Sequence, residues 1–384
     1  MRIRMPRRHS SVRCRGALVV ALALCAGPAL AEPPASAGGV DDDVMASELA
    51  TWERAANAAL RERAESLAAG GDADDKIAAF LLYPMDSTYD AQGAGRRPLP
   101  RPAHVQQWLL DAAADPAAPS PSALWRVASS CPIEPARCDA EGALERLVRM
   151  DPGNGAVWLL KAQRADARGD RVDSERWFTR AADAPRIDFY DRDQGRLLLR
   201  SAAGVELPPM GAKAAAAQRQ LSGSDSPATT AGWLDASLFG RWMAWALPGL
   251  QWASSQCPTG AAALTDAGQL DRCRRLHARM AEQATSAVIQ LYALAKAIQL
   301  QPELPSLREA YRQALWQYAQ AAEVLTPFGQ PPRADYLRRV LADGELATWA
   351  TLLEAAGIAL VAPAGWLPDQ PSQRELILNG TRSN

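Results

Sequence analysis

Two consecutive blocks of thirty-four residues, 121–154 and 155–188, constrain the fold of this 384-residue chain more than any other feature. In each block a large and a small residue mark the first half, a small–large–small ladder marks the second half, and a proline stands near the end. These positions are Leu124, Ala128, Ala140, Leu144, Leu147 and Pro152 in the first block and Trp158, Ala162, Ser174, Phe178, Ala181 and Pro185 in the second. The spacing predicts a helix–turn–helix hairpin in each block.

The pattern resembles that of tetratricopeptide repeat proteins. The second block departs from that family at Lys161 and Ala165, where leucine and tyrosine are usual. The resemblance implies helical hairpins that stack on one another, because a single hairpin is too small to bury its own apolar face. The alternative is an ordinary series of amphipathic helices that shares the spacing by chance.

The rest of the chain predicts more helices and no convincing strand. Apolar faces at helical spacing occur in residues 43–69, 74–83, 104–114, 284–300, 306–325, 334–342 and 345–360. Ser306 and Glu309 predict a capping box at the start of one helix, and the Gly-, Pro- and Arg-rich residues 86–103 predict a loop. The expected fold class is all-α, with hairpins stacked as a tetratricopeptide-like α-solenoid in two helical halves.

Composition suggests where those halves lie. We expect an N-terminal helical region at 32–200, a linker rich in Ala, Gly, Ser, Thr and Pro at 201–232, a C-terminal helical region at 233–362, and an irregular tail at 363–384. Similar tryptophan-containing segments begin at Trp108 and Trp233, and again at Trp125 and Trp252. These echoes suggest a duplication, although alanine-rich sequence could also produce them.

Residues 1–31 have the features of a cleaved signal peptide. Six arginines without an acidic residue precede a twelve-residue apolar run, and the small residues Ala29 and Ala31 then mark a cleavage site. The mature protein is therefore expected in the periplasm or outside the cell. Loss of the leader leaves 36 basic against 43 acidic residues, a net charge of −7. An acidic chain without a basic stripe argues against nucleic-acid partners, and no later stretch predicts a membrane span.

Four cysteines remain after the leader is removed: Cys131, Cys138, Cys257 and Cys273. In an oxidising compartment four cysteines usually form two disulfides. Three pairings are open, and we favour the local one, 131–138 and 257–273. A zinc site is the alternative, but the spacing contains no Cys-x-x-Cys pair.

Catalytic and cofactor motifs are absent from the sequence. It contains no Gly-x-Ser-x-Gly elbow, phosphate-binding loop or His-Glu-x-x-His motif. His104 and His277, the two histidines after the leader, are interpreted as surface groups. The aspartates at 72–75 and at 188–193 lack the pattern of a calcium loop. We therefore expect no cofactor and no metal site, and we find no acidic residue that stands out inside an apolar stripe.

Partner binding is the remaining hypothesis. In peptide-binding tetratricopeptide proteins the first helices line a groove, at offsets that hold Ser122, Trp125, Ser129, Leu159, Gln163 and Asp166 here. Trp242 and Trp245 are further candidates, although a packed core is the more ordinary role for them. The sequence favours a non-catalytic scaffold that binds a protein or peptide of the cell envelope. An envelope enzyme, for example one acting on peptidoglycan through unrecognised carboxylates, and a purely self-assembling homo-oligomer are the alternatives.

Overall fold

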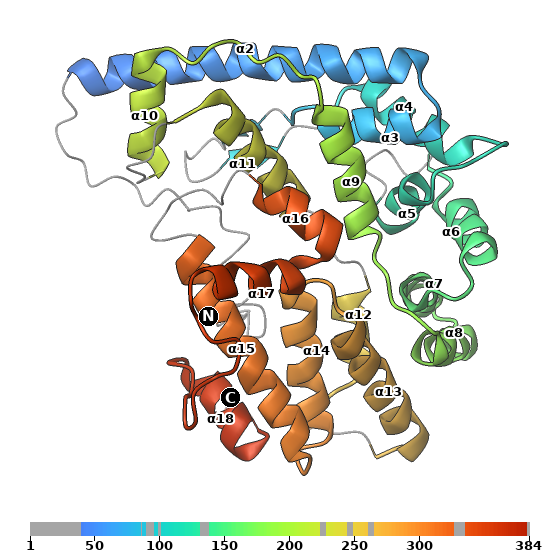
Figure 1. Cartoon of the computed structure of the whole chain (residues 1–384). Coiled ribbons are helices and arrows are strands. Elements are labelled where there is room, and N and C mark those ends of the chain that lie inside the picture. The colour runs from blue at the N-terminus through green and yellow to red at the C-terminus, as the bar shows by residue number, and fades with distance from the viewer. Residues whose placement is uncertain are drawn as a thin grey trace, which may run out of the picture. The chain divides into compact units, whose positions relative to one another are not determined.

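The computed structural model describes residues 40–85, 87–89, 96–98, 101–130, 138–222, 228–243, 249–259, 265–325 and 335–381. These residues form seventeen helices, and their only strands are a short pair (Figure 1). The predicted all-α class is confirmed. The predicted leader lies outside the described residues, and none of the described helices is long and apolar enough to cross a membrane.

The first region begins with a long helix that covers shorter ones. Helix α2 (Val40–Gly70) packs on α3 (Ala73–Leu82), and α3 packs on α4 (Ala103–Ala114). The Asp72 side chain starts α3 by accepting a 3.0 Å hydrogen bond from the Asp75 amide. Strands β1 (Ser87–Tyr89) and β2 (Arg96–Pro98) pair antiparallel where the sequence predicted a loop. That prediction was wrong for these six residues, because a hairpin this short shows no alternation of apolar and polar residues.

Both thirty-four-residue blocks contain two helices, as predicted. The first holds α5 (Pro121–Ser130) and α6 (Ala140–Met150), and the second holds α7 (Gly155–Ala167) and α8 (Arg171–Asp183). Of the large and small pattern positions, all except the half-buried Ala140 are buried. The spacing therefore marks the inner faces of two hairpins. The stacked solenoid remains a prediction.

The chain leaves this row of helices after α8. Helix α9 (Asp191–Ala202) packs mainly on α3, and also contacts α2, α11 (Thr230–Met243) and α16 (Tyr336–Asp343). Helix α8 instead packs against α13 (Ala267–Gln283), from far along the sequence (Figure 1). Helices α14 (Ala287–Leu300) and α15 (Pro305–Leu325) then follow side by side, while α12 (Leu250–Gln256) lies on α7. Along this series of contacts, α8 is therefore followed by α13, α14 and α15 of the C-terminal half and not by α9.

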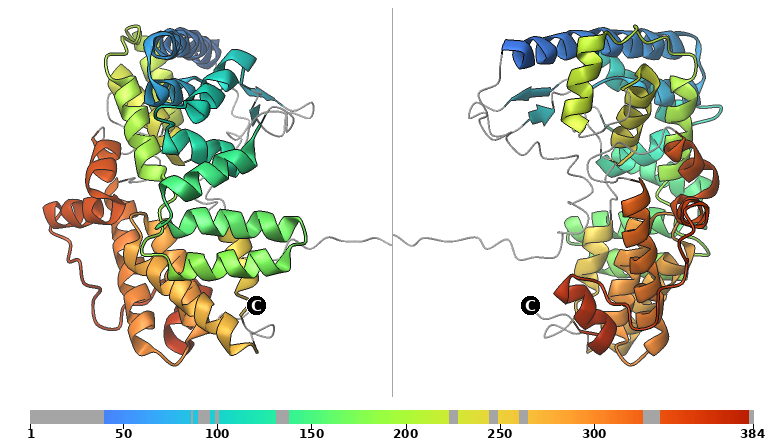
Figure 2. Two further views of the ribbon diagram at one scale, coloured as in Figure 1. Left: turned by 90° about the vertical axis from the view of Figure 1, so that its right-hand side faces the viewer. Right: turned by 60° about the vertical axis from the view of Figure 1, so that its left-hand side comes forward.

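The predicted linker at 201–232 needs correction. Its residues 212–222 form α10 (Ala212–Ser222), which packs on α2 (Figure 2). Ala214 and Ala217 are buried against Leu49 and Trp52 of α2. A run of alanines has high helix propensity and lets two helices approach closely, so low sequence complexity here marks a packed helix.

Two predictions near the C-terminus were also wrong. The tail expected to be irregular contains α18 (Pro371–Asn379), which follows α17 (Glu345–Ala355) and packs on α14 and α15. The capping box is not formed either. Helix α15 already starts at Pro305, and the Glu309 carboxylate accepts hydrogen bonds from Arg312 and Gln313.

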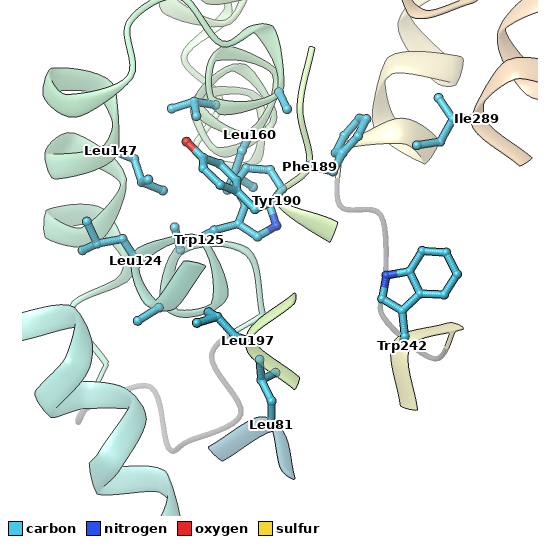
Figure 3. Packing of buried hydrophobic residues seen from close by; sticks show 14 of the residues in the cluster. Leu81, Leu124, Trp125, Leu147, Leu160, Phe189, Tyr190, Leu197, Trp242 and Ile289 are labelled. Atoms are coloured by element: carbon cyan, nitrogen blue, oxygen red, sulfur yellow. The ribbon is translucent and has the colours of Figure 1, made fainter. Parts of the chain in front are cut away.

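Most of the buried apolar side chains form one cluster. It runs from α2 through the hairpins to α17, and Figure 3 shows Trp125, Tyr190 and Leu197 among its members. Residues 37–384 accordingly group as one compact unit.

Candidate functional site

The residues predicted to line a peptide groove are mostly covered by the protein's own chain. Ser122, Trp125 and Leu159 are at most 3% exposed. The Trp125 ring lies 5.4 Å from the ring of Tyr190, in the segment that leads into α9 (Figure 3). Leu159 lies under Gly249, at the start of α12. These three residues belong to the core, and their prediction as an exposed binding face was wrong.

The other groove positions offer little free surface. Asp166 is exposed but accepts a 2.9 Å hydrogen bond from the indole nitrogen of Trp252. Ser129 and Gln163 are half-buried, and a role for them in binding stays a prediction. Trp242 is 6% exposed and donates to the Asp191 carbonyl, so it is a core residue. Trp245 lies outside the described residues.

The cysteine prediction is confirmed where the structure tests it. Cys257 and Cys273 form a disulfide that joins the end of α12 to α13. Cys138 is also disulfide-bonded, and its predicted partner, Cys131, lies outside the described residues. The two histidines differ: His104 is exposed, whereas His277 is fully buried. Burial lowers the pKa of His277 to about 4. The prediction of a surface His277 was therefore wrong.

A pocket of about 290 Å³ lies where the α8–α9 connection meets the turn between α13 and α14. Six charged residues line one side of it. They are Arg186, Asp188, Asp191, Arg192, Asp193 and Arg196. The other side is formed by the ends of α13 and α14, including Met280, Gln283, Thr285 and Ile289. The pocket thus joins residues nearly one hundred positions apart in the sequence.

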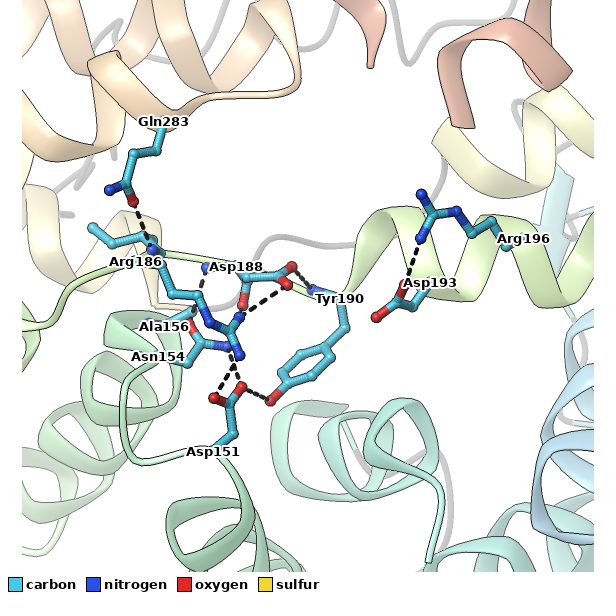
Figure 4. Close-up of polar contacts among 10 residues, drawn as sticks. Asp151, Asn154, Ala156, Arg186, Asp188, Tyr190, Asp193, Arg196 and Gln283 are labelled. Atoms are coloured by element: carbon cyan, nitrogen blue, oxygen red, sulfur yellow. Dashed lines mark hydrogen bonds and ion pairs between the residues drawn. The ribbon is translucent and has the colours of Figure 1, made fainter. Parts of the chain in front are cut away.

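A hydrogen-bonded network fixes the charged wall (Figure 4). Arg186 forms ion pairs with Asp151 and Asp188, with N–O distances of 2.5 and 3.2 Å. The buried Asn154 amide group accepts from the Asp188 amide and donates to the Asp188 carbonyl, both at 2.9 Å. Asn154 and Asp188 are the last residues of the two thirty-four-residue blocks. The end of one block therefore positions the end of the next.

Tyr190 also belongs to this network, and its backbone adopts a disfavoured conformation. Its φ of 58° is the only left-handed value of a non-glycine residue in the described part of the chain. Such a conformation is disfavoured for an L-residue by roughly 1 kcal/mol. The Tyr190 amide donates to Asp188 at 2.8 Å, and the hydroxyl donates to Asp151 at 2.6 Å. These bonds hold the turn from which α9 and its charged first turn begin.

The opposite wall is tied to the charged one. The Gln283 side chain accepts from the Ile187 amide at 3.1 Å and donates to the Pro185 carbonyl at 2.8 Å. Farther along α9, Arg196 pairs with Asp193 at 3.2 Å and donates to the Leu341 carbonyl of α16. Figure 4 shows this pair on α9, apart from the Asp151–Arg186 network. Hydrogen bonds therefore join the α8–α9 connection to α13, and α9 to α16.

Burial raises the pKa of acidic groups that lie in and near the pocket. Burial, together with the nearby negative charge of Asp188, raises the pKa of Asp191 to about 6. Burial raises the pKa of Glu345, and the charge of Asp191 adds to this effect. Glu345 accepts a 2.7 Å hydrogen bond from the Ala287 amide at the start of α14 and a 3.2 Å bond from the Tyr336 hydroxyl. Glu345 thus has a clear structural role, while Asp191 lines the pocket itself.

The sequence carried only a weak signal for these residues. Asp188, Asp191 and Asp193 lack the spacing of a calcium loop, and no group of three metal-ligating side chains occurs among the described residues. Glu345 follows Gly344 at a helix start, and nothing in its neighbours in the sequence shows that it will be buried against the start of α14 and Tyr336 of α16. The pocket depends on long-range packing, which is why local patterns missed it.

No protein-family model, curated protein or solved structure matches this chain. The site must therefore be interpreted from its own geometry.

Proposed function

We propose that the protein is a non-catalytic scaffold of the cell envelope, and that the pocket beside α9 receives a charged segment of a protein or peptide partner. The observation that supports this most is that three arginines and three aspartates line one side of the pocket. Such a surface offers both donors for a carboxylate and acceptors for an ammonium or guanidinium group. Secretion into the periplasm belongs to the same proposal and is supported by the leader-like residues 1–31.

The pocket replaces the groove expected from the repeats as the place where a partner binds. Trp125 and Leu159 are buried by the protein's own segments, so a partner cannot reach them in this fold. Asp193 and Arg196, in contrast, keep more than half of their side-chain surface exposed. Partner specificity would then come from complementary charge at the rim of the pocket, which affects association rates and salt dependence most strongly.

The test is crosslinking in intact cells, followed by capture of the mature chain and mass spectrometry. We expect one reproducible partner that is lost in the double variant Asp193→Asn/Arg196→Gln. The matched control is Asp173→Asn/Arg176→Gln, which removes another Asp–Arg ion pair three residues apart, on α8, whose arginine is exposed. Equal capture by both variants would place the interface elsewhere, and capture of the chain alone would support the self-assembling homo-oligomer.

An envelope enzyme is the second candidate, because Asp191 has the properties of a general acid or base. It lines the pocket, and its pKa of about 6 lies close to neutral pH, where a general acid or base is most effective. Incubation of the mature protein with purified peptidoglycan tests this function. Release of soluble fragments by the wild type but not by Asp191→Asn would establish it, and no release by the wild type would count against it.

A further inference from the structure

The three aspartates that line the pocket beside α9 differ in the partners of their side chains. Asp188 forms an ion pair with Arg186, and Asp193 forms one with Arg196, both at 3.2 Å. Asp191 lines the same pocket, but its carboxylate forms no ion pair within the described part of the chain. The pocket therefore presents one carboxylate that is available to a ligand.

The arginines of the pocket are directed to other partners. Arg192 and Arg196 both donate to the Leu341 carbonyl of α16, at 3.4 and 3.2 Å. Arg186 is engaged by two carboxylates. A ligand anion would have to compete with these acceptors, whereas a ligand cation can pair with Asp191 directly. The pocket therefore favours a cationic ligand.

The surroundings of Asp191 make its negative charge costly. Burial and the charge of Asp188 raise the pKa of Asp191 to about 6, and the backbone amides of α9 and the charge of Arg192 only partly oppose this. The charge of Asp191 in turn adds to the raised pKa of Glu345, which is buried at the start of α14. The α13–α14 wall contributes no charged side chain to the pocket, and the other charged groups are the two ion pairs described above. A cation bound beside Asp191 reduces the repulsion between these carboxylates.

The lining of the pocket suits the aliphatic part of a cationic side chain. Met280, Ala284 and Ile289 line the wall opposite the charged one. Lysine and arginine bury their aliphatic stems against apolar surface while the charged head stays with polar partners. The volume of about 290 Å³ lies just below the range of about 300–1,000 Å³ that is usual for small-molecule sites. A pocket of this size suits one such side chain.

We propose that the pocket beside α9 binds a single lysine or arginine side chain of the partner, with its cationic head paired to the Asp191 carboxylate. This assignment rests on the proposed scaffold function and adds the charge that the partner must carry. It also makes binding depend on pH. Below about pH 6 Asp191 takes up a proton, and the cation loses its counter-charge. The affinity should therefore fall about tenfold from pH 7 to pH 5.

Calorimetry with N-acetyl-arginine amide tests the charge preference on the mature wild-type chain at pH 7 and low ionic strength. We expect saturable binding of one molecule. The citrulline analogue, which has nearly the same shape but no charge, should show no saturable binding, and neither should the glutamate analogue. Equal binding of the arginine and citrulline analogues, tighter binding of the glutamate analogue, or no saturable heat from the arginine analogue overturns the proposal.

Two matched variants test whether Asp191 is the residue that binds the cation. Asp191→Asn should weaken binding of the arginine analogue about tenfold or more at pH 7 and abolish its pH dependence. The control is Asp173→Asn, which changes an aspartate in the first turn of α8 that does not line the pocket. It should bind as the wild type does at both pH values. An equal loss in the two variants, or a wild-type affinity that is the same at pH 5 and pH 7, contradicts the role of Asp191.

Capture from intact cells separates this inference from the proposed function. A partner that is lost in Asp193→Asn/Arg196→Gln but captured equally by the wild type and Asp191→Asn leaves the scaffold function intact and overturns the inference. Binding of the arginine analogue without any captured partner supports the cation site and counts against the scaffold function. Loss of the partner in Asp191→Asn, but not in Asp173→Asn, supports both.

Discussion

At the scale of single residues, the pKa of Asp191 shows how burial changes the chemistry of a group that lines the pocket. It stands in the first turn of α9, where the nearby backbone amides favour its charged form. Burial and the charge of Asp188 oppose that effect and win, so the pKa rises to about 6 from an ordinary value of 3.8. The folded state therefore holds a proton that the unfolded chain has already released over part of the acidic range.

This difference predicts a pH-dependent stability. Because the pKa is raised on folding, the wild type loses stability relative to Asp191→Asn as the pH rises from about 3.8 to about 6. The relative loss should reach about 3 kcal/mol, at about 1.4 kcal/mol for each unit of the pKa shift, and then stay constant. Urea unfolding of both proteins at intervals between pH 3.5 and 7.5 measures it. If the free energies of unfolding of the two proteins change in parallel across this pH range, the pKa of Asp191 is not raised on folding.

At the scale of elements, the sequence contains clear signals for several helix ends, but these signals did not predict every helix. Gly70 ends α2 as expected, and the acidic residues after it begin α3. Helix α18 has equally clear signals, with Pro371 in its first turn and Gly380 in a left-handed conformation just after it. Polar residues around it made the tail seem irregular. The packing that stabilises it, on α14 and α15, could not be predicted from local sequence.

Helix α18 can be tested with two leucines of the same helix. Leu376 is fully buried in the cluster formed with α14 and α15, whereas Leu378 is 55% exposed. Leu376→Ala should lower the free energy of unfolding by about 2–5 kcal/mol, because it leaves a cavity. Leu378→Ala should change it by less than about 0.5 kcal/mol. Denaturant titration separates the two, and equal effects would mean that α18 does not pack as described.

The disulfide between α12 and α13 is a second element-scale feature that the sequence predicted. It closes a loop over a sequence separation of 16 residues. Replacing both Cys257 and Cys273 by serine should cost about 3 kcal/mol, mainly by freeing the unfolded chain. Thermal unfolding of the double variant and the wild type under oxidising conditions measures this. A cost near zero would indicate that the hairpin is held by its side-chain packing alone.

At the scale of the whole molecule, the sequence predicted the helices better than their arrangement. The spacing in residues 121–188 identified two hairpins and their buried faces correctly. It could not show that Phe189 and Tyr190 would cover Trp125, or that α13 would become the neighbour of α8. Both depend on contacts between residues far apart in the chain. The pocket, which those contacts create, was consequently missed together with Asp191.

Helix α9 packs on α3 of the N-terminal half and also contacts α11 and α16 of the C-terminal half. The lack of a side chain at Gly195 allows α9 to approach α16 closely. A Cβ atom at Gly195 would overlap the Leu341 side chain of α16 and lie 3.1 Å from the Trp242 ring. Gly240 of α11 is also helical, but a Cβ there meets nothing within 4 Å. The two glycines therefore form a matched pair, one at a tight contact between distant segments and one in open space.

Alanine at these two positions should have opposite effects. Gly195→Ala should cost about 1–2 kcal/mol, because the overlap outweighs the gain in helix propensity, whereas Gly240→Ala should be neutral or stabilise by up to about 1 kcal/mol. If α9 and α16 couple the two halves, Gly195→Ala should also speed amide hydrogen exchange on both sides of the contact, in α5–α8 as well as in α13–α17. Faster exchange confined to α9 and α16 would mean that the halves unfold independently. The pocket between α9 and the α13–α14 turn would then be a flexible site, whose shape a partner could change on binding.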